Sequence, residues 1–326
     1  MADEHRKNGF VKIILVSPVD AEAIETLRSH HEVAIALDYF TSDDAEFLRD
    51  QEVLVFRSGG EITRDMLDRS PKLSLVVRAG SGFDNIDLDD ARRRGIRVVR
   101  IPGPSARSVA EFTFGLMLSL CRKIVQADAL VRDGRWPKPQ LGGALLSGKV
   151  LGIVGAGNIG SRVGELGVAW DMKVLGCVNP ADERWEPPPG IEPSDMGTVL
   201  RRADFLTLHT PLTEANYHLI GADELAAMKD GSYIVNTARG GVVDEAALYE
   251  ALASGHLAGA ALDVHEQEGE GVIPKLAELP NVVLTPHIGG SAHESQRAIG
   301  RRLVELIDAH SRADLNAEVT DSELLV

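Results

Sequence analysis

The sequence predicts an α/β protein built from two doubly wound parallel-sheet domains, one flavodoxin-like and one Rossmann-like, with a cleft between them. Short β-branched runs alternate with amphipathic stretches along most of the chain, which is typical of parallel sheets covered by helices on both faces. The alternation breaks at the Pro/Gly/Ser-rich segment 102–108 and resumes at residue 149. A glycine-rich turn, GAGNIG at 155–160, then joins a strand to a helix-forming run.

The first series of elements contains five candidate strands, at 11–16, 32–37, 53–58, 73–80 and 96–101. The helical stretch 292–310 comes after the second series, and we expect it to return to the first domain. The predicted substrate domain is therefore discontinuous, with residues 1–103 and 292–326, and it surrounds a nucleotide-binding domain of residues 104–291.

The second domain is predicted to open with one long, largely buried helix at 108–134. Six candidate strands follow, which is the number in a complete Rossmann sheet; they lie at 149–155, 173–178, 205–210, 233–238, 258–264 and 282–287. The proline-rich segment 186–193 is predicted to be a local loop, because strand-helix units continue on both sides of it.

The composition indicates a folded cytoplasmic protein that acts on small molecules. The 326 residues include 34 Lys and Arg and 49 Asp and Glu, which gives a net charge of −15. This charge argues against nucleic acid or an anionic membrane as a partner. The two cysteines, Cys121 and Cys177, are too few for a disulfide framework. We find no signal peptide, and no run approaches the roughly 20 apolar residues of a membrane span.

The turn at 155–160 predicts a dinucleotide site. Gly155 suits a tight turn, Gly157 lets the backbone approach a pyrophosphate, and Gly160 permits close packing of helix on strand. The helix N-terminus supplies N–H donors to the anion. A glycine turn without a ligand is the alternative, but the strand, the helix and the downstream architecture together favour a cofactor.

The nature of the cofactor depends on the residue that holds the adenosine ribose, about 20 positions beyond the glycines. Asn179 stands there in place of the Asp or Glu of NAD enzymes. An amide can bond the ribose hydroxyls without repelling a 2′-phosphate. We expect NAD, with NADP left open.

Three polar residues lie at or shortly after the carboxyl ends of predicted strands of the second domain, at the edge where ligands bind in doubly wound sheets. They are Arg239, Glu268 and His287. A guanidinium can grip a substrate carboxylate and polarise a ketone, an imidazolium can donate a proton as hydride arrives, and a carboxylate can orient the imidazole. The trio predicts reduction of a 2-oxo acid and the reverse oxidation, without a metal.

The chain resembles the D-isomer-specific 2-hydroxyacid dehydrogenases, particularly the phosphoglycerate dehydrogenase-like branch, nearly from end to end. The motifs occur in the family order: RAGSGFDNIDLDDARRRGIRVV, SVAEFTFGLMLSL, SGKVLGIVGAGNIG, LHTPLTEANYHLI, MKDGSYIVNTARGGVVDEAAL, AGAALDVHEQE and LTPHIGGS. The resemblance implies that Arg239 binds and polarises the substrate and that Glu268 and His287 form the acid-base pair. It also implies a homodimer through the long helix.

The resemblance further implies residues for the two ligands. Asp263 would bond the nicotinamide carboxamide, and other residues would line the cofactor: Asn158, Ile159, Thr210, Pro211, Thr237, Ala238 and Gly289. In the first domain, backbone N–H groups at Ser81 and Gly82 would bind the substrate carboxylate, with Arg57 and Arg78 reaching the same cleft.

The sequence departs from the family pattern at several positions, including Arg100, Ser105, His265 and Gly269, where the family usually has Asn, Asn, an aromatic residue and Pro. The substrate therefore stays open between 3-phosphoglycerate and hydroxypyruvate or glyoxylate, with formate less favoured. The chain ends at 326, and we expect it to lack the appended regulatory domains of long phosphoglycerate dehydrogenases. A nucleotide-sensing corepressor-like scaffold of the same fold, without significant turnover, is the alternative function.

Overall fold

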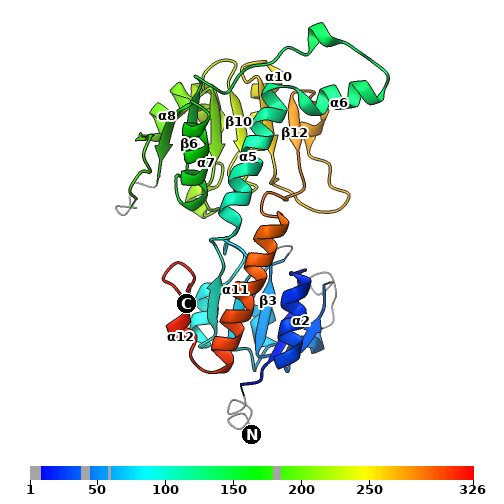
Figure 1. Ribbon diagram of the computed structural model, residues 1–326, viewed down its shortest axis with the longest axis vertical. Helices are drawn as coiled ribbons and strands as arrows, with labels where there is room; N and C mark the ends of the chain where they lie inside the picture. The colour runs from blue at the N-terminus through cyan, green and yellow to red at the C-terminus, as the bar shows by residue number, and fades with distance from the viewer. Residues whose placement is uncertain (1–8, 38–44, 58–59, 179–184) are drawn as a thin grey trace. The chain divides into compact units, whose positions relative to one another are not determined.

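A computed structural model describes residues 9–37, 45–57, 60–178 and 185–326. The chain divides into two compact units, Met1–Ser105 with Ser291–Val326 and Ala106–Gly290. Each unit contains one sheet with helices on both faces (Figure 1). None of the described helices is long and apolar enough to cross a membrane.

The first unit has a five-stranded sheet in the order β2-β1-β3-β4-β5, which is the flavodoxin-like order. Every pairing between these strands is parallel. The strands are β1 (Lys12–Leu15), β2 (Glu32–Ile35), β3 (Val53–Phe56), β4 (Leu75–Arg78) and β5 (Arg97–Arg100). The helices are α2 (Ala21–His30), α3 (Arg64–Asp68), α4 (Leu88–Arg93), α11 (His293–Ser311) and α12 (Leu315–Glu318), with a 3-10 turn η3 at Ala45–Leu48.

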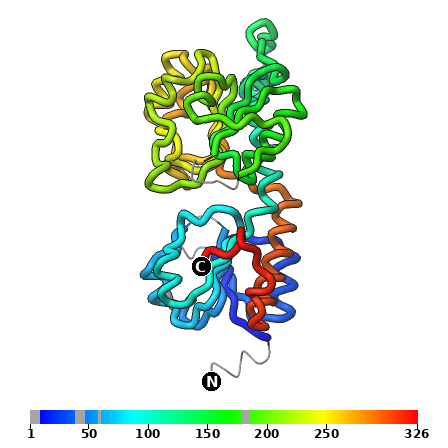
Figure 2. Tube along the Cα trace, turned by 90° about the vertical axis from the view of Figure 1, so that its left-hand side faces the viewer, coloured from blue at the N-terminus to red at the C-terminus, as the bar shows by residue number. Residues whose placement is uncertain are grey.

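Alternate side chains of these strands face opposite layers of helices. Ile13, Val53 and Val77 pack with Leu27 of α2 and Leu303 of α11, while their neighbours in the strands pack toward α3 and α4. The ribbon and the Cα tube both show α11, in orange, beside α2, in blue (Figures 1 and 2). The helix predicted at 292–310 thus completes one face of the first sheet from the far end of the sequence.

The second unit has a seven-stranded parallel sheet in the order β12-β11-β10-β9-β6-β7-β8. Its strands are β6 (Val150–Val154), β7 (Lys173–Cys177), β8 (Ile191–Pro193), β9 (Phe205–Leu208), β10 (Tyr233–Asn236), β11 (Gly259–Leu262) and β12 (Val282–Leu284). Its helices are α5 (Ser105–Cys121), which begins at the last residue of the first unit, α6 (Ile124–Arg132), α7 (Asn158–Ala169), α8 (Met196–Arg202), α9 (Ala222–Ala227) and α10 (Glu245–Ala253), with short 3-10 turns at Lys138–Gln140, Glu214–Asn216 and Lys275–Glu278.

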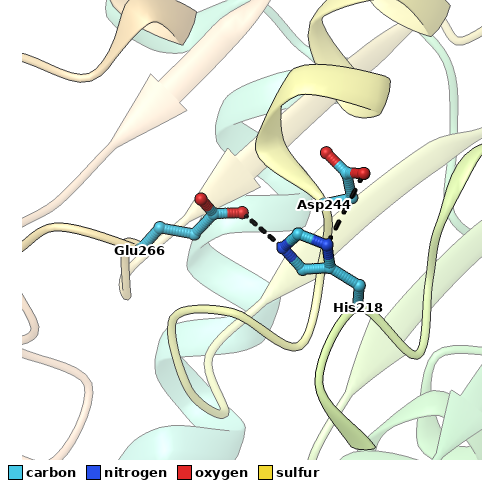
Figure 3. A group of neighbouring side chains, drawn as sticks. All are labelled: His218, Asp244 and Glu266. Atoms are coloured by element: carbon cyan, nitrogen blue, oxygen red, sulfur yellow. Dashed lines mark hydrogen bonds and ion pairs between the residues drawn. The ribbon is translucent and has the colours of Figure 1, made fainter.

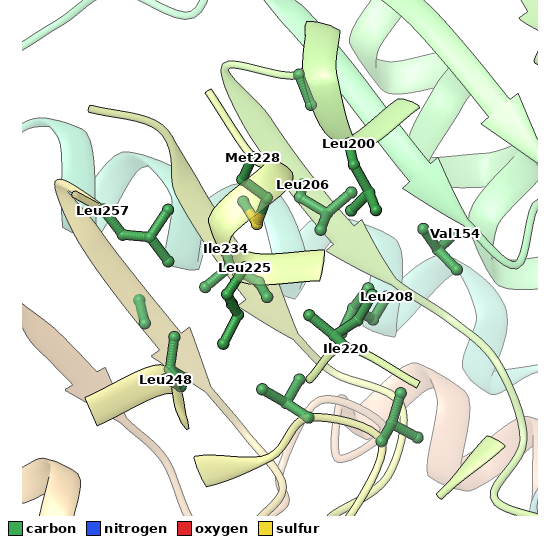
Figure 4. Packing of buried hydrophobic residues seen from close by; sticks show 14 of the residues in the cluster. Val154, Leu200, Leu206, Leu208, Ile220, Leu225, Met228, Ile234, Leu248 and Leu257 are labelled. Atoms are coloured by element: carbon green, nitrogen blue, oxygen red, sulfur yellow. The ribbon is translucent and has the colours of Figure 1, made fainter. Parts of the chain in front are cut away.

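Two apolar layers hold this second sheet. On one face, α5 and α7 pack against Leu151, Ile153 and Val235. On the other face, α8, α9 and α10 enclose a cluster that Figure 4 shows from close by, with Leu206 and Ile234 facing the helices. The strand order reverses between β9 and β7 on either side of β6, which places the ligand edge at the carboxyl ends of these strands.

The seventh strand, β8, lies where the sequence predicts only a loop. Ile191 pairs in parallel with Val174 of β7, and its side chain is buried. A Cβ atom at Gly164 would lie 2.3 Å from Ile191 Cδ1, and one at Gly176 would lie 3.0 Å from Ile191 Cγ2. The loop prediction is therefore wrong for 191–193, because two glycines far away in the sequence make room for this isoleucine.

The long buried helix predicted at 108–134 is two helices, and only α5 is buried. The chain breaks at Lys123, whose φ is +54°. The carbonyl of Cys121 accepts a hydrogen bond from Ala144 N (2.9 Å), and the returning chain passes so close that a Cβ at Gly143 would lie 2.2 Å from this oxygen. The whole of α6 is described and has no buried residue.

Candidate active site

The glycine turn has the geometry that a dinucleotide needs. Gly155 follows β6 with φ +91°, and a Cβ there would lie 2.7 Å from the carbonyl carbon of His209. A Cβ at Gly160 would lie 2.3 Å from the oxygen of Gly155. At Gly157, the N-cap of α7, a Cβ would meet no described atom within 4 Å. Two glycines thus permit close packing, and the third leaves open space at a helix N-terminus, where a pyrophosphate binds well.

The other predicted cofactor residues of the second unit all follow carboxyl ends of its strands or begin α7. Buried polar atoms without a hydrogen-bond partner among the described residues occur at this edge, at Thr210 Oγ1 and His209 Nε2. Burial lowers the pKa of His209 to about 3, so its ring is neutral. These features fit a bound dinucleotide. The structure places Asn158 and Ile159 at the start of α7, Thr210 and Pro211 after β9, Thr237 and Ala238 after β10, and Gly289 after β12. Asn179 lies outside the described residues.

Arg239 follows β10, and a turn held by Asn236 sets its position. The Asn236 side chain is buried; its Oδ1 accepts from Ala238 N (3.0 Å) and its Nδ2 donates to Arg239 O (2.9 Å). Arg239 Nη1 donates to Ala238 O at 2.6 Å. The sequence analysis did not single out Asn236. An Asn at the end of a strand is nevertheless a known signal for a turn, because its side chain can accept a hydrogen bond from the backbone N–H two residues later.

Glu268 and His287 are in direct contact. His287 Nδ1 lies 3.0 Å from Glu268 Oε2, and both side chains are about two-fifths exposed, at 40% and 41%. Burial raises the pKa of Glu268, but the hydrogen bond and charge of His287 outweigh burial and leave this pKa below its ordinary value. Because Nδ1 faces the carboxylate, Nε2 is the ring nitrogen left for a substrate.

The backbone at His287 is held in an unusual conformation. Its φ is +55°, in the left-handed region that side chains other than glycine seldom adopt. His287 N donates to Asp263 O at 2.7 Å. Such a conformation persists only where the surroundings impose it, and it is common at functional sites.

Asp263 supplies much of that restraint. Its carboxylate is 1% exposed and accepts hydrogen bonds from Thr285 Oγ1 (2.6 Å), Ile288 N (2.9 Å) and Gly289 N (2.7 Å). The resemblance implied a contact with the nicotinamide carboxamide. The three hydrogen bonds show a further role that the sequence did not suggest, which is to shape the loop that carries His287.

The loop of Glu268 packs directly on the loop of Arg239. A Cβ at Gly240 would lie 1.8 Å from His265 O, so only glycine fits beneath this backbone. His265 N donates to Glu268 Oε1 (3.2 Å), and its Nε2 lies 3.1 Å from Thr285 O. Gly269 has φ +149°, which proline cannot adopt, and this accounts for the departure from the family pattern there.

The candidate substrate residues Arg57, Arg78, Ser81 and Gly82 lie in the first unit, apart in sequence from the trio. Ser81 Oγ donates to Pro102 O (3.1 Å) and lies 3.0 Å from Ser105 Oγ. Arg57 Nη2 donates to Ser291 Oγ (2.8 Å), and Arg78, 9% exposed, lies over the ring of Phe56.

Arg100, a departure from the family pattern, supports the Ser81 loop. Its Nη1 donates to Ser81 O (3.1 Å), its Nε donates to Ser322 O (2.8 Å), and its guanidinium lies over the ring of Phe83. Burial lowers the pKa of Arg100. Arg100 thus links the Ser81 loop to the C-terminal segment.

The doubly wound sheet, the glycine turn at α7 and the contact between Glu268 and His287 after the strand ends are together typical of a nicotinamide-dependent dehydrogenase. The family description "D-isomer specific 2-hydroxyacid dehydrogenase, NAD binding domain" matches residues 114–289. The chain belongs to the D-isomer specific 2-hydroxyacid dehydrogenase family, and it is an NAD(P)-dependent enzyme that acts on CH–OH donors.

Individual relatives agree with this assignment. A hydroxypyruvate reductase of Thermotoga maritima is 42% identical over 293 residues, covering 89% of this chain and 95% of the relative. A D-3-phosphoglycerate dehydrogenase of Methanocaldococcus jannaschii is 41% identical over 95% of this chain, which spans only 59% of that relative. The crystal structure of a D-lactate dehydrogenase from Aquifex aeolicus, complexed with NAD and lactic acid, matches with a TM-score of 0.85 and 29% identity, covering 96% of this chain and 98% of that one.

Proposed function

We propose that this enzyme reduces a short 2-oxo acid of the hydroxypyruvate or glyoxylate class to its D-2-hydroxy acid, and oxidises the product in reverse, with NAD preferred to NADP. The contact of 3.0 Å between Glu268 and His287 carries the proposal, because it is an acid-base pair at the ligand edge of a dinucleotide-binding sheet. Two relatives support this substrate class: the hydroxypyruvate reductase is 42% identical over 89% of this chain, and a glyoxylate reductase of Thermococcus litoralis is 34% identical over 96% of it.

The chemistry divides among the trio. Arg239 binds the substrate carboxylate and polarises the ketone. His287 donates a proton from Nε2 to the carbonyl oxygen in reduction and removes the hydroxyl proton in oxidation, while Glu268 stabilises the imidazolium. When bound, the nicotinamide accepts or supplies the hydride.

Other residues are assigned supporting roles in this proposal. Asp263 shapes the His287 loop and remains the candidate for the nicotinamide carboxamide. In the first unit, the Ser81–Gly82 turn is proposed to bind an anionic group through backbone N–H donors, with Arg57 and Arg78 as the nearby cations.

The experiment is a panel of 2-oxo acids with NADH and with NADPH, followed by the absorbance of the reduced nicotinamide. We expect turnover of hydroxypyruvate or glyoxylate with NADH, at a kcat/KM at least about tenfold above that with NADPH. The panel should include the oxidised form of 3-phosphoglycerate. Tight NADH binding without turnover of any acid would contradict the proposal and favour the nucleotide-sensing scaffold.

We also propose a homodimer that forms through α6 and the segment after it. Ile124, Val125, Val131, Trp136 and Leu145 are exposed by 50%, 54%, 52%, 79% and 69%. Several exposed large apolar side chains within one stretch of the chain favour a protein partner. Sedimentation equilibrium should give twice the mass of the chain, and Trp136→Asp should shift the measured mass toward that of the monomer. A wild-type monomer at micromolar concentration would contradict the proposal.

We also propose a cytoplasmic location, which the two free, buried cysteines support.

A further inference from the structure

A histidine outside the catalytic trio lies between two carboxylates near the Glu268 loop. His218 Nε2 is 3.0 Å from Glu266 Oε1, and His218 Nδ1 is 3.6 Å from Asp244 Oδ2 (Figure 3). All three side chains are about one-third exposed, at 31%, 33% and 29%. The contact with Glu266 is within hydrogen-bond distance, and the contact with Asp244 is longer.

A fourth residue, Glu245, joins this group through a reciprocal pair of hydrogen bonds. Glu266 N donates to Glu245 Oε1 (2.8 Å), and Glu245 N donates to Glu266 Oε1 (3.1 Å). Burial raises the pKa of Glu245. The hydrogen bond from Glu266 N lowers this pKa and the charge of Glu266 raises it, and the net result is a pKa above its ordinary value. Glu245 is thus connected to His218 through Glu266. We call His218, Asp244, Glu245 and Glu266 the acidic clasp.

The four members of the acidic clasp come from three segments that follow different strands. His218 has φ +52°, its N donates to Gly241 O (2.7 Å), and its ring stacks on Tyr217. Asp244 Oδ1 accepts from the first amides of α10, at Ala246 and Ala247 (both 3.0 Å). Glu266 belongs to the loop after β11. The clasp thus joins the segments that follow β9, β10 and β11.

The position of Glu266 connects the clasp to the acid-base pair. Only one residue separates Glu266 from Glu268 in the sequence, so the two side chains share one short stretch of backbone. His265 O lies over Gly240, next to Arg239, and His265 N donates to Glu268 Oε1. Displacement of Glu266 would therefore move the carboxylate that faces His287.

A metal ion is the competing explanation for three such side chains, since their ligand atoms lie within 4.8 Å of one another. Figure 3 shows the imidazole between the two carboxylates, with each ring nitrogen directed to its own carboxylate. Each ring nitrogen thus already faces a carboxylate oxygen, so an ion bound to either nitrogen would have to displace that contact. The arrangement favours an ion-paired histidine over a metal centre.

We propose that the acidic clasp positions Glu268 for its contact with His287 by fixing the segment 264–269. The inference rests on the proposed function of that pair. His218 and Glu266 are positioning residues here, because they act through Glu268 and need no contact with the substrate.

The first experiment measures amide hydrogen exchange of the segment 264–269 in the whole protein, in the presence of EDTA. His218→Gln and Glu266→Gln should each speed exchange there on the order of tenfold, while amides of β6 and β10 keep their protection. His256→Gln is the matched control, because His256 is 30% exposed in the same unit and faces Asp230 at 3.6 Å. Unchanged exchange at 264–269 in both clasp variants overturns the proposal. If EDTA abolishes the protection of this segment in the wild type, a metal ion holds the segment, and the proposal is also overturned.

The second experiment is a double-mutant cycle on turnover of the 2-oxo acid. Glu266→Gln should lower kcat about tenfold with the Kd of NADH unchanged, but should cost less than about twofold in the Glu268→Gln background. The same tenfold loss in both backgrounds would show that Glu266 does not act through Glu268. A wild-type protein without turnover would defeat the proposed function instead, and the exchange experiment would still decide whether the clasp holds the segment.

Discussion

At the scale of single residues, Asp263 shows how one buried carboxylate sets the shape of a catalytic loop. It accepts three hydrogen bonds from the segment 285–289, and its carbonyl accepts one from His287 N. These bonds lie around a histidine with positive φ. The position of His287, the proposed proton donor, therefore depends on a side chain 24 residues earlier in the sequence.

Asp263→Asn tests this dependence. The amide replaces one acceptor oxygen by an NH2 group that faces backbone N–H donors, so the free energy of unfolding should fall by about 1–3 kcal/mol and kcat should fall with it. Urea denaturation and turnover measure the two effects. Asp204→Asn is the control: Asp204 accepts from Val150 N at the opposite edge of the sheet, so it should lose stability without a selective loss of kcat. Wild-type stability and turnover in Asp263→Asn would refute the role of the carboxylate.

The sequence can predict where Arg239, Glu268 and His287 lie, because strand ends in a parallel sheet meet at one edge. It cannot predict the restraints on them. The hydrogen bonds of Asn236 and Asp263 depend on the path of each loop, and the loop of Glu268 lies on Gly240 only because another strand delivers it there. Local sequence carries no signal for such contacts between loops.

At the scale of elements, β-branched runs identify the strands well, but two predictions fail for a shared reason. The strand β8 exists because Gly164 and Gly176 admit Ile191, and the break between α5 and α6 exists because Ala144 N takes the carbonyl of Cys121. Both depend on partners distant in sequence. Periodicity within a segment cannot report them.

The C-terminal segment offers a pH test at this scale. Arg302 of α11 donates to both oxygens of Glu323, at 2.8 and 2.9 Å, and Thr320 N donates to the same carboxylate at 2.9 Å. Burial raises the pKa of Glu323, but these hydrogen bonds outweigh it and leave the pKa below its ordinary value. The ionised carboxylate therefore stabilises the fold above the unfolded pKa of about 4.3, and this contribution is lost as the pH falls through the lower folded pKa.

Glu323→Gln should be less stable than the wild type by about 1–3 kcal/mol at neutral pH. The difference should shrink toward zero below about pH 4, because protonated Glu323 resembles the amide. Urea denaturation at several pH values measures it. A difference that stays constant down to acid pH would mean that the charge of Glu323 contributes nothing.

At the scale of the whole molecule, a chain with a net charge of −15 binds an anionic cofactor and an anionic substrate. Its global field opposes both ligands, so binding depends on local positive features. We propose that the N-terminus of α7 beside Gly157 and the guanidinium of Arg239 supply them at the carboxyl edge of the second sheet. The fold places these features by its strand order, and the sequence pattern predicts six of the seven strands in that order but not the order itself.

The assignment of the catalytic trio is tested most directly by comparing Arg239→Ala and His287→Ala in turnover and in NADH binding. We predict that His287→Ala lowers kcat by about 10²–10⁴ with little change in KM, because it removes proton transfer alone. Arg239→Ala should raise KM and lower kcat together, because it removes carboxylate binding and polarisation, and both variants should bind NADH as the wild type does. Turnover of His287→Ala at the wild-type rate would contradict the account.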